Sequence, residues 1–381
     1  MPRRRIAIVQ PYISQYRTAF FQRLAMDLSD RGVELVVAHG DAHGDQAVRA
    51  DTASLETAVH LRQRTFRIGS RTLVHRDLGE LARNCDALVL EQALHNVELY
   101  TTLLNPRRTP AIALWGHTYT HLRTAGWARK VATGALTRRA HWFFAFTQAG
   151  ADHEVSQGFP AERITMVYHS IDTSALREAR TRVAEDRLQA FRERHRLVPG
   201  RTAVYLGGLD TIKRTGFLLA AAASVARRLP GFRLLVAGDG TERHLVEQAD
   251  ARGAETVYLG NVFDDERRAL LGQAADLMLA PGAVGLCAVV SFALQTPVVT
   301  VPRPDHGPEF EYLENRRNCL IAPDDVESFA QTVADALCDP TLLARLKKGC
   351  EADAGYYTLE RFSTSFADGV VHMLEMEGRC P

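Results

Sequence analysis

Along the first half of the chain, short apolar runs typical of strands alternate with segments whose apolar residues recur at helical spacing. Short β-branched runs, "RIAIVQ" near the start and "VELVVAH" at 33–39, predict strands, and "RTAFFQRLAMDL" between them carries apolar residues at helical spacing. The strand signal returns at 86–93, 110–117 and 141–147. These runs are apolar enough to be buried on both faces of a parallel sheet. The pattern therefore predicts a domain that opens with a βαβ unit.

A charged stretch separates this series from a second one. The segment "DTSALREARTRVAEDRLQAFRERHRLVPGR" has helical spacing, ends in Pro199 and Gly200, and is interpreted as a linker. Strands and helices alternate again from "TAVYLGGL" to "TPVVTVP", which predicts a second doubly wound parallel sheet. We expect an α/β fold with two Rossmann-like domains at 1–175 and 201–355, a linker helix at 176–200, and a C-terminal helix at 356–381 that packs back across the domains. Two such sheets facing a cleft would bind ligands at the carboxyl ends of their strands.

Composition narrows the class of protein. A chain of 381 residues can bury two cores, and 46% apolar with 24% charged residues is typical of a soluble globular protein. The net charge of +1 gives no reason to expect nucleic acid as a partner. The six cysteines are scattered without a metal-ligand spacing, so we expect no metal and a cytoplasmic location. Neither a signal peptide nor a membrane span is expected.

Two glycine-bearing turns follow predicted strands of the second series. In "VAGDGTER", Gly238 and Gly240 stand between a strand and a helix; a tight turn is the favoured interpretation, and backbone approach to a phosphate is the alternative. In "YLGGLDTIKRTGF", Lys213 and Arg214 stand at the start of a helix. Two cations at a helix N-terminus are unfavourable unless an anion binds there, so this turn predicts an anion site more strongly, with a solvated pair on a surface helix as the alternative.

Several motifs in order resemble one family. They are "WGHTYT", "MVYHSIDT", "GGLDTIKR", "VAGDG", "YLGNV", "AADLMLAPGAVGLCAVVSFALQTPVVT" and "HGPEFEYLENRRNCLI". Together they resemble the family-four retaining glycosyltransferases of the two-Rossmann GT-B type, over nearly the whole chain. The resemblance implies transfer of a sugar from a nucleoside diphosphate sugar to a hydroxyl, without a metal or a further cofactor. It also implies that the first domain binds the acceptor and the second binds the donor.

The family's donor residues are carried over only where the motifs match. Lys213 matches the family's diphosphate-binding lysine, whereas Gly208 stands in the slot of its basic partner, for which Arg214 is the replacement that we expect. The family's paired glutamates, eight positions apart, fall on Gly282 and Val290, which offer no carboxylate. The resemblance implies these further donor contacts: Gly207, Gly208, Gly238, Gly240, Gly282, Ala283, Val284, Gly285, Leu286, Val290 and Glu311.

Two further groups complete the expected catalytic set. In "HGPEFEY", Glu309 is predicted to face the ligand and Glu311 to pair with an arginine such as Arg316, with two solvated acids as the alternative. The resemblance implies that His117, after a strand of the first domain, contacts the donor sugar, the phosphate or the acceptor. His169 is interpreted as a structural turn residue. The catalytic candidates are His117, Lys213, Arg214 and Glu309.

The first domain offers acceptor contacts but does not identify the acceptor. The candidates are Tyr12, Tyr16, Arg17 and Trp115, and a small molecule, a lipid-linked sugar or a polysaccharide would all suit them. In "GWARKVATGALTRRAHWFF", basic residues surround an apolar face and allow weak peripheral membrane contact, although a buried helix and strand is the favoured interpretation. The alanine- and arginine-rich usage is typical of a bacterial source.

Three hypotheses about function remain. We favour an active retaining glycosyltransferase. The loss of both motif carboxylates at Gly282 and Val290 leaves a catalytically silent binding or scaffolding protein as one alternative. A GT-B enzyme of another reaction, such as a sugar-nucleotide epimerase or a transferase with an unusual donor, is the other.

Overall fold

The chain divides into two compact units. The computed structural model describes residues 3–42, 51–69, 71–105, 110–116, 127–253 and 255–377. Unit 1 comprises Met1–Asp172 together with Leu359–Pro381, and unit 2 comprises Thr173–Thr358. The first unit boundary therefore falls three residues before the expected one at 175.

Unit 1 alternates strands and helices in its described residues. Its strands are β1 (Arg4–Gln10), β2 (Val33–His39), β3 (Val59–His60), β4 (Gln63–Ile68), β5 (Arg71–Arg76), β6 (Ala87–Glu91), β7 (Ala111–Gly116), β8 (Trp142–Ala145) and β9 (Ile164–Met166). Its helices are α1 (Thr18–Ser29), α3 (Gly79–Asn84), α4 (Val97–Leu103), α6 (Trp127–Thr137), α7 (Gln148–Ser156), α16 (Leu359–Glu377) and the 3-10 turns η1 (Gln15–Arg17) and η2 (Ala161–Arg163).

The strands of unit 1 form the expected parallel sheet. Across the described residues its order is β3-β2-β1-β6-β7-β8-β9, and β4 and β5 form a separate antiparallel hairpin. Strand β1 pairs with β2 on one side and with β6 on the other, both in parallel. The carboxyl ends of β1 and β6 are therefore the switch point of this sheet, where the connections diverge and ligands commonly bind.

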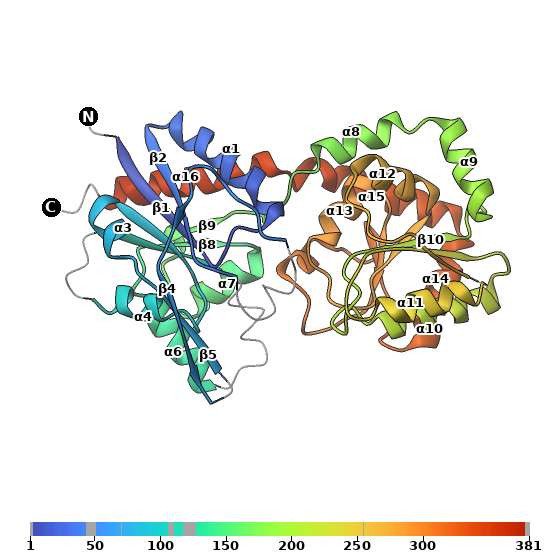
Figure 1. The fold of residues 1–381 in the computed structure, drawn as a ribbon, viewed down its shortest axis with the longest axis horizontal. Coiled ribbons are helices and arrows are strands. Elements are labelled where there is room, and N and C mark those ends of the chain that lie inside the picture. Colours follow the sequence, from blue (N-terminus) through green and yellow to red (C-terminus); the bar gives the residue numbers. More distant parts are fainter. Residues whose placement is uncertain are drawn as a thin grey trace. The chain divides into compact units, whose positions relative to one another are not determined.

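The last helix of the chain completes the core of unit 1. Figure 1 shows α16, coloured red, lying beside the blue α1. The Phe362 ring stacks on Phe20 of α1 at 4.0 Å, and the Phe366 ring stacks on Phe144 of β8 at 4.0 Å. Gly369 lies so close to β8 and β9 that a Cβ would stand 2.6 Å from the Phe144 ring. A C-terminal helix was expected at 356–381; within the described residues it spans Leu359–Glu377, and it belongs to the core of unit 1.

Unit 2 is contiguous and repeats the alternation. Its strands are β10 (Thr202–Leu206), β11 (Arg233–Ala237), β12 (Thr256–Tyr258), β13 (Leu277–Leu279), β14 (Val298–Thr300) and β15 (Cys319–Ile321). Its helices are α8 (Ser174–Arg182), α9 (Glu185–His195), α10 (Thr215–Arg228), α11 (Arg243–Ala251), α12 (Asp265–Ala274), α13 (Cys287–Leu294), α14 (Val326–Leu337), α15 (Pro340–Tyr356) and the 3-10 turn η3 (Pro308–Tyr312).

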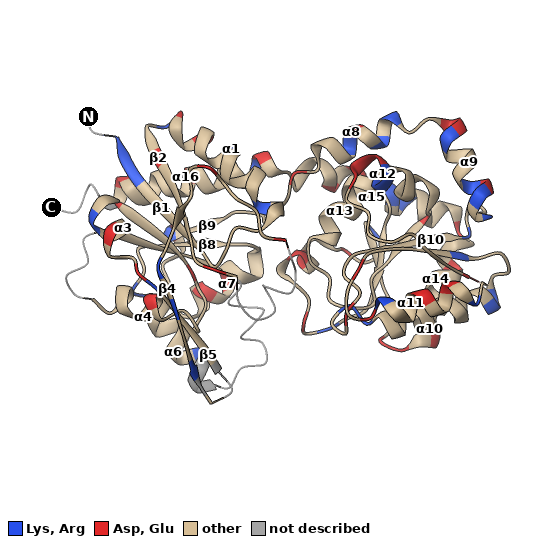
Figure 2. Cartoon of the chain, in the orientation of Figure 1, with Lys and Arg blue, Asp and Glu red and all other residues tan. Residues whose placement is uncertain are grey.

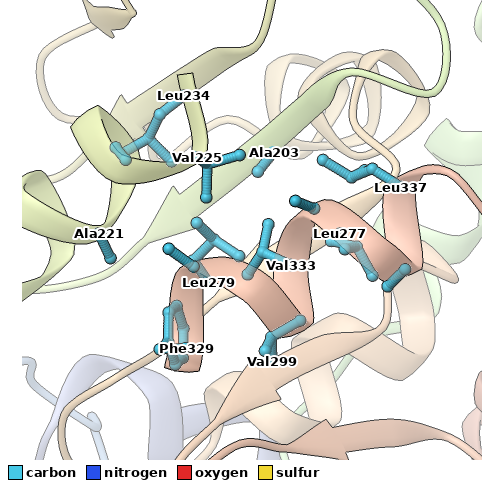
Figure 3. Close-up of a cluster of buried hydrophobic side chains, with 14 of the residues drawn as sticks. Ala203, Ala221, Val225, Leu234, Leu277, Leu279, Val299, Phe329, Val333 and Leu337 are labelled. Carbon is cyan, nitrogen blue, oxygen red and sulfur yellow. The ribbon is translucent and has the colours of Figure 1, made fainter. Parts of the chain in front are cut away.

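The sheet of unit 2 is parallel across its described strands, in the order β12-β11-β10-β13-β14-β15. Strand β10 pairs with β11 and with β13, so the switch point lies at the carboxyl ends of β10 and β13. Figure 3 shows part of the core on one face of this sheet, where Leu279 and Val299 from the strands gather with Phe329 and Val333 of α14. The expected doubly wound α/β architecture is confirmed in both units.

The charged stretch between the two series differs from its expected form. A single linker helix was expected at 176–200, but the structure has two helices, with extended backbone at Val183 and Ala184 between them. Both helices carry interleaved basic and acidic residues (Figure 2). Arg180 of α8 donates a hydrogen bond to the Leu294 carbonyl at 2.8 Å, and Arg192 of α9 bonds the Gln273 carbonyl at 3.4 Å. These helices therefore pack as part of unit 2.

Candidate functional site

The candidate site lies at the switch point of unit 2. We call residues 281–286, between β13 and α13, the glycine loop, and residues 210–214, between β10 and α10, the lysine turn. A third segment, residues 301–309 after β14, is called the histidine loop. All three follow the carboxyl ends of parallel strands and lie on one edge of the sheet.

The glycine loop packs directly on the lysine turn. A Cβ at Gly282 would stand 2.4 Å from three main-chain atoms of Lys213, so a glycine is required by close backbone approach. The amide of Ala283 donates to the Ile212 carbonyl at 3.0 Å, and the Lys213 ammonium donates to the Ala283 carbonyl. The carboxylate of Asp210 accepts the Lys213 amide at 2.9 Å. Gly282 therefore has a packing role, at the position where the resemblance would place the first glutamate.

His306 ties the glycine loop to the histidine loop. Its Nδ1 accepts the Val284 amide at 2.9 Å, and its Nε2 lies 2.8 Å from the Val301 carbonyl, to which it donates. The Gly307 amide also donates to the Val284 carbonyl at 2.6 Å. The imidazole is 3% exposed and stacks on Phe310 at 4.0 Å. Burial lowers the pKa of His306, against a smaller opposing effect of the bond to Val301.

Glu309 packs against the glycine loop. Its side chain is 3% exposed, and its Oε2 lies 3.7 Å from the position that a Cβ of Gly285 would take. A Cβ at Gly307 would stand 2.7 Å from the same oxygen. The carboxylate thus lies against Gly285 and Gly307, whereas Glu311 is exposed. Of the two acids, Glu309 is the one placed beside the glycine loop.

The solvent-accessible part of this site is formed by half-buried residues at the start of α13. Gly285, Leu286, Cys287 and Val290 are half-buried, while Ala283, Val284, Ala288 and Val289 are buried. These half-buried residues lie at the N-terminal turns of α13, where the first amide groups of a helix have no intrahelical acceptor. This surface therefore offers backbone donors flanked by an aliphatic side chain at Val290, and no carboxylate at that position.

Arg214 is held in place by other groups of unit 2. Arg214 has a left-handed backbone conformation (φ 57°). Its guanidinium pairs with Asp324 and donates to the Pro281 carbonyl at 3.4 Å. The guanidinium carbon also lies 4.1 Å from the Phe217 ring centre. The expected role of Arg214 as a second diphosphate cation would require it to share or leave Asp324.

The remaining glycines pack the loops against one another. A Cβ at Gly238 would stand 1.8 Å from the Gly207 carbonyl oxygen, and one at Gly240 would stand 2.3 Å from the Leu209 carbonyl oxygen. Gly208 is exposed, and its carbonyl accepts the Tyr205 hydroxyl. These contacts favour the tight-turn interpretation of the Gly-x-Gly sequence, because the close neighbour at both positions is protein backbone.

The acceptor candidates of unit 1 have differing exposure. The Tyr12 hydroxyl is bonded to Asp51 at 3.0 Å and its ring is buried, whereas Tyr16 is 39% exposed. Arg17 lies 4.8 Å above the Trp115 ring and donates to the Tyr16 hydroxyl at 3.2 Å. Trp115 is 3% exposed, and its Nε1 has no hydrogen-bond partner in the structure as described. Tyr16 and Arg17 are thus the accessible members, and His117 lies outside the described residues.

His169 lies in an aromatic cluster of unit 1. Its ring contacts Phe146 at 4.7 Å and Phe362 at 5.4 Å, both edge to face. It is 3% exposed, in agreement with the structural role that we expected.

The basic segment around α6 also makes contacts within unit 1. Arg138 donates to the Gln157 carbonyl, and Arg139 donates to the Leu103 carbonyl at 2.8 Å. The side chains of Trp127 and Arg129 lie outside the described residues. Across the described ranges, no helix combines the length and apolar character that crossing a membrane requires.

The described cysteines form no disulfide, and no metal-ligand cluster lies among the described residues. The five cysteines within the described ranges are free thiols. In those same ranges, no three His, Cys, Asp or Glu side chains are grouped as metal ligands.

Sequence reasoning placed His306 in the loop after the strand "PVVTVP" but assigned it no role, and it did not select Asp324. The signal for His306 was its position in the loop that follows the buried strand β14, at the carboxyl edge of the sheet. Asp324 carried no local signal, because its partner Arg214 is 110 positions away in the sequence.

The comparisons with known proteins address the same region. Residues 200–339 match the family described as "Glycosyl transferases group 1". A glycogen synthase of Mycobacterium tuberculosis strain H37Rv is 28% identical over 245 residues, which cover 58% of this chain and 53% of that protein. A D-inositol 3-phosphate glycosyltransferase of Segniliparus rotundus is 27% identical over 255 residues, which cover 64% of this chain and 54% of that protein. The chain thus spans about half the length of the curated relatives it matches.

Solved structures resemble the whole chain in fold. A glycosyltransferase from Rickettsia africae ESF-5 aligns with a TM-score of 0.68 at 12% identity and covers 100% of both chains. Anabaena Alr3699/HepE in complex with UDP aligns with a TM-score of 0.67 at 14% identity and covers 97% of this chain and 99% of that one. The chain is therefore a protein of the GT-B fold. Residues 200–339 of its second unit match the glycosyl transferases group 1 model, in agreement with the resemblance stated from the sequence for this unit.

Proposed function

We propose that the protein transfers a sugar from a nucleoside diphosphate sugar to a hydroxyl acceptor, with retention of the anomeric configuration and without a metal. The observation that carries this proposal is the glycine loop at the start of α13, packed on Lys213 within the region that matches the group 1 family. Backbone amides at a helix N-terminus beside an ammonium are a favourable environment for a diphosphate.

In this proposal the donor diphosphate binds at Gly285, Leu286 and Cys287. Lys213 exchanges its bond to the Ala283 carbonyl for the diphosphate, and stabilises the negative charge that develops as the sugar departs. Glu309 and His306 hold the loop in shape. Tyr16 and Arg17 are the acceptor contacts in unit 1, and the acceptor is a small molecule, a lipid-linked sugar or a polysaccharide.

The first experiment is calorimetric titration with UDP, GDP, ADP and dTDP. UDP is the first choice because a structural neighbour is a complex with UDP. Saturable binding of one diphosphate is expected, and we expect it to be lost in Lys213→Ala. Lys348→Ala is the matched control, because Lys348 is an exposed lysine on α15 of the same unit. Equal binding by wild type and Lys213→Ala would contradict the role of that lysine.

The chemical claims need separate measurements. With the donor identified, NMR of the product reports the anomeric configuration, and activity after treatment with a chelator reports metal dependence. Inversion of the anomeric centre, or loss of activity that a divalent cation restores, would overturn the corresponding claim.

The aliphatic side chain at Val290 and the engagement of Arg214 with Asp324 favour one alternative, a binding or scaffolding protein without catalysis. Detection of a glycosidic product with any donor excludes this alternative. A GT-B enzyme of another reaction would bind a sugar nucleotide and change it without forming a glycosidic bond.

A further inference from the structure

The glycine loop depends on a buried imidazole that bridges two segments of unit 2. His306 accepts a hydrogen bond from the Val284 amide on one nitrogen and donates one to the Val301 carbonyl from the other. A ring that accepts on Nδ1 and donates from Nε2 is the neutral tautomer, since both nitrogens of a protonated imidazole carry hydrogens. The two bonds therefore fix both the charge and the orientation of this side chain.

The bridge holds the residue at the centre of the glycine loop. Val284 lies between Gly282, which packs on Lys213, and Gly285, which faces Glu309. Its amide bonds His306 and its carbonyl accepts the Gly307 amide, so both of its main-chain groups are bound by the histidine loop. A proton on Nδ1 would place two hydrogens against each other and break the Val284 bond. The loop geometry at the start of α13 is thereby coupled to the state of one side chain.

We propose that His306 is a positioning residue that holds the glycine loop in its ligand-binding shape only while its ring is neutral. This inference deepens the proposed function, on which its binding consequences rest. His306 touches neither donor nor acceptor in this account. It acts through Val284 on the backbone amides of Gly285, Leu286 and Cys287.

The surroundings of His306 maintain the neutral ring. Burial lowers the pKa, and the charges of Arg303 and Lys213 act in the same direction. The Val301 carbonyl and the charge of Asp305 act in the opposite direction, and the Glu309 carboxylate lies nearby against Gly307. Because the pKa of His306 is lower in the folded chain, the ring is protonated in the unfolded chain at a higher pH than in the folded chain. The contribution of His306 to stability is therefore present above about pH 6.5 and is lost as the pH falls toward the folded-state pKa.

The first test is NMR of the ring and of the loop amides in the full chain without ligand. We expect the imidazole nitrogen shifts of His306 to report a neutral Nε2–H tautomer at neutral pH, and the Val284 amide to be protected from hydrogen exchange. In His306→Ala we expect Val284 to lose that protection. A protonated ring at neutral pH, or equal protection in wild type and variant, would overturn the proposal whether or not any nucleotide binds.

The second test is calorimetric titration with UDP between about pH 7.5 and about pH 5.5. His306→Ala is expected to weaken binding roughly tenfold, because a buried amide loses its acceptor. His306→Gln supplies an acceptor oxygen and an N–H donor that do not titrate, so we expect it to restore much of the affinity and to remove the acid-induced loss. His195→Gln is the matched control, because His195 is half-buried on α9 of the same unit and packs on Phe191.

The outcomes separate the two proposals. The role of His306 is supported if UDP affinity no longer falls at acid pH in His306→Gln but still falls in His195→Gln. An unchanged acid response in His306→Gln would overturn it. Failure of UDP and of the other diphosphates to bind wild type would contradict the proposed function, while the tautomer and exchange measurements would still decide the role of His306.

Discussion

At the switch point of unit 2, the contacts that shape the glycine loop run mainly through main-chain groups. The Ala283 and Gly307 amides donate to the Ile212 and Val284 carbonyls, and Gly282 allows two backbones to touch. The Val284 amide is the exception, because it donates to the His306 ring. Near the strand ends of unit 1, the polar contacts run between side chains instead. Arg76 pairs with Glu98 at 2.6 Å inside the unit, and Arg17 covers the Trp115 ring.

This difference indicates which changes each region tolerates. Main-chain contacts survive most side-chain replacements but fail where a Cβ is added at a close approach. Side-chain contacts fail when one partner is removed, and the cost depends on how deeply the other partner is buried. Substitutions in the two regions should therefore differ in both size and readout.

The largest effect is expected from Glu98→Gln in unit 1. The side chains of Arg76 and Glu98 are 1% and 4% exposed, and the Arg76 Nε and Nη2 already have no hydrogen-bond partner within the described structure. Removing the carboxylate charge leaves a buried guanidinium uncompensated, at a cost of about 3–5 kcal/mol in the free energy of unfolding. Chemical denaturation measures this cost.

Glu34→Gln is the control for Glu98→Gln, because its 3.0 Å pair with Arg5 has side-chain exposures of 46% and 42%. It should change stability little. Equal losses in the free energy of unfolding from Glu98→Gln and Glu34→Gln would show that burial of the ion pair does not determine the loss of stability.

The next effect is expected from Gly282→Ala in unit 2. The added methyl would stand 2.4 Å from the Lys213 backbone, so the glycine loop and the lysine turn must separate. We expect a loss of about 1–3 kcal/mol in stability and loss of nucleotide binding. Gly216→Ala on α10 is the control, since nothing lies within 4 Å of the position that its Cβ would take. Thermal unfolding and calorimetry give the two readouts, and nucleotide affinity unchanged in Gly282→Ala would contradict the packing argument.

A smaller effect is expected from Arg17→Ala in unit 1. Loss of the guanidinium over Trp115, 4.8 Å away, should lower stability by about 0.5–1 kcal/mol. If Arg17 contacts the acceptor, the KM for the acceptor rises while nucleotide affinity stays the same. Arg23→Ala, in a half-buried pair with Asp27 on α1, is the control. A change in nucleotide affinity in Arg17→Ala would contradict the proposal that unit 1 binds the acceptor and unit 2 binds the donor.

The smallest effect on stability is expected from Val290→Glu in unit 2. Val290 is half-buried on α13, so its replacement should change stability by no more than about 0.5 kcal/mol. A new carboxylate that accepts a ribose hydroxyl would add roughly 1.5–3 kcal/mol, or tenfold and more in nucleotide affinity. Val290→Leu controls for side-chain size. Unchanged affinity in Val290→Glu would favour a donor that is not held through its ribose.

Local patterns predicted the fold, and they selected residues that the structure brings together at the candidate site. The apolar runs of β1, β2, β6, β7 and β8 were recognisable because buried parallel strands are continuously apolar. The β4–β5 hairpin, within "QRTFRIGSRTLVHR", was missed because its many arginines mask any strand rhythm. Lys213 and Gly282 were both selected from motifs that each occupy a few consecutive residues.

The contacts between distant segments could not be predicted in the same way. Gly282 touches the backbone of Lys213 across a sequence separation that no local motif spans. Arg214 was expected to bind an anion, and Asp324, beyond the last strand of the sheet, supplies one from the protein itself. The break between α8 and α9 carries no proline or glycine at Val183 and Ala184, so the charged stretch gave no sign of it.

The place of α16 in the core of unit 1 has a consequence for synthesis on the ribosome. Phe362 and Phe366 stack on Phe20 and Phe144, which are translated more than two hundred residues earlier. Unit 2 is contiguous and can fold as soon as its own residues have emerged. Unit 1 must wait with an open apolar face until residues 359–377 leave the exit tunnel, although its first strand is among the earliest segments made.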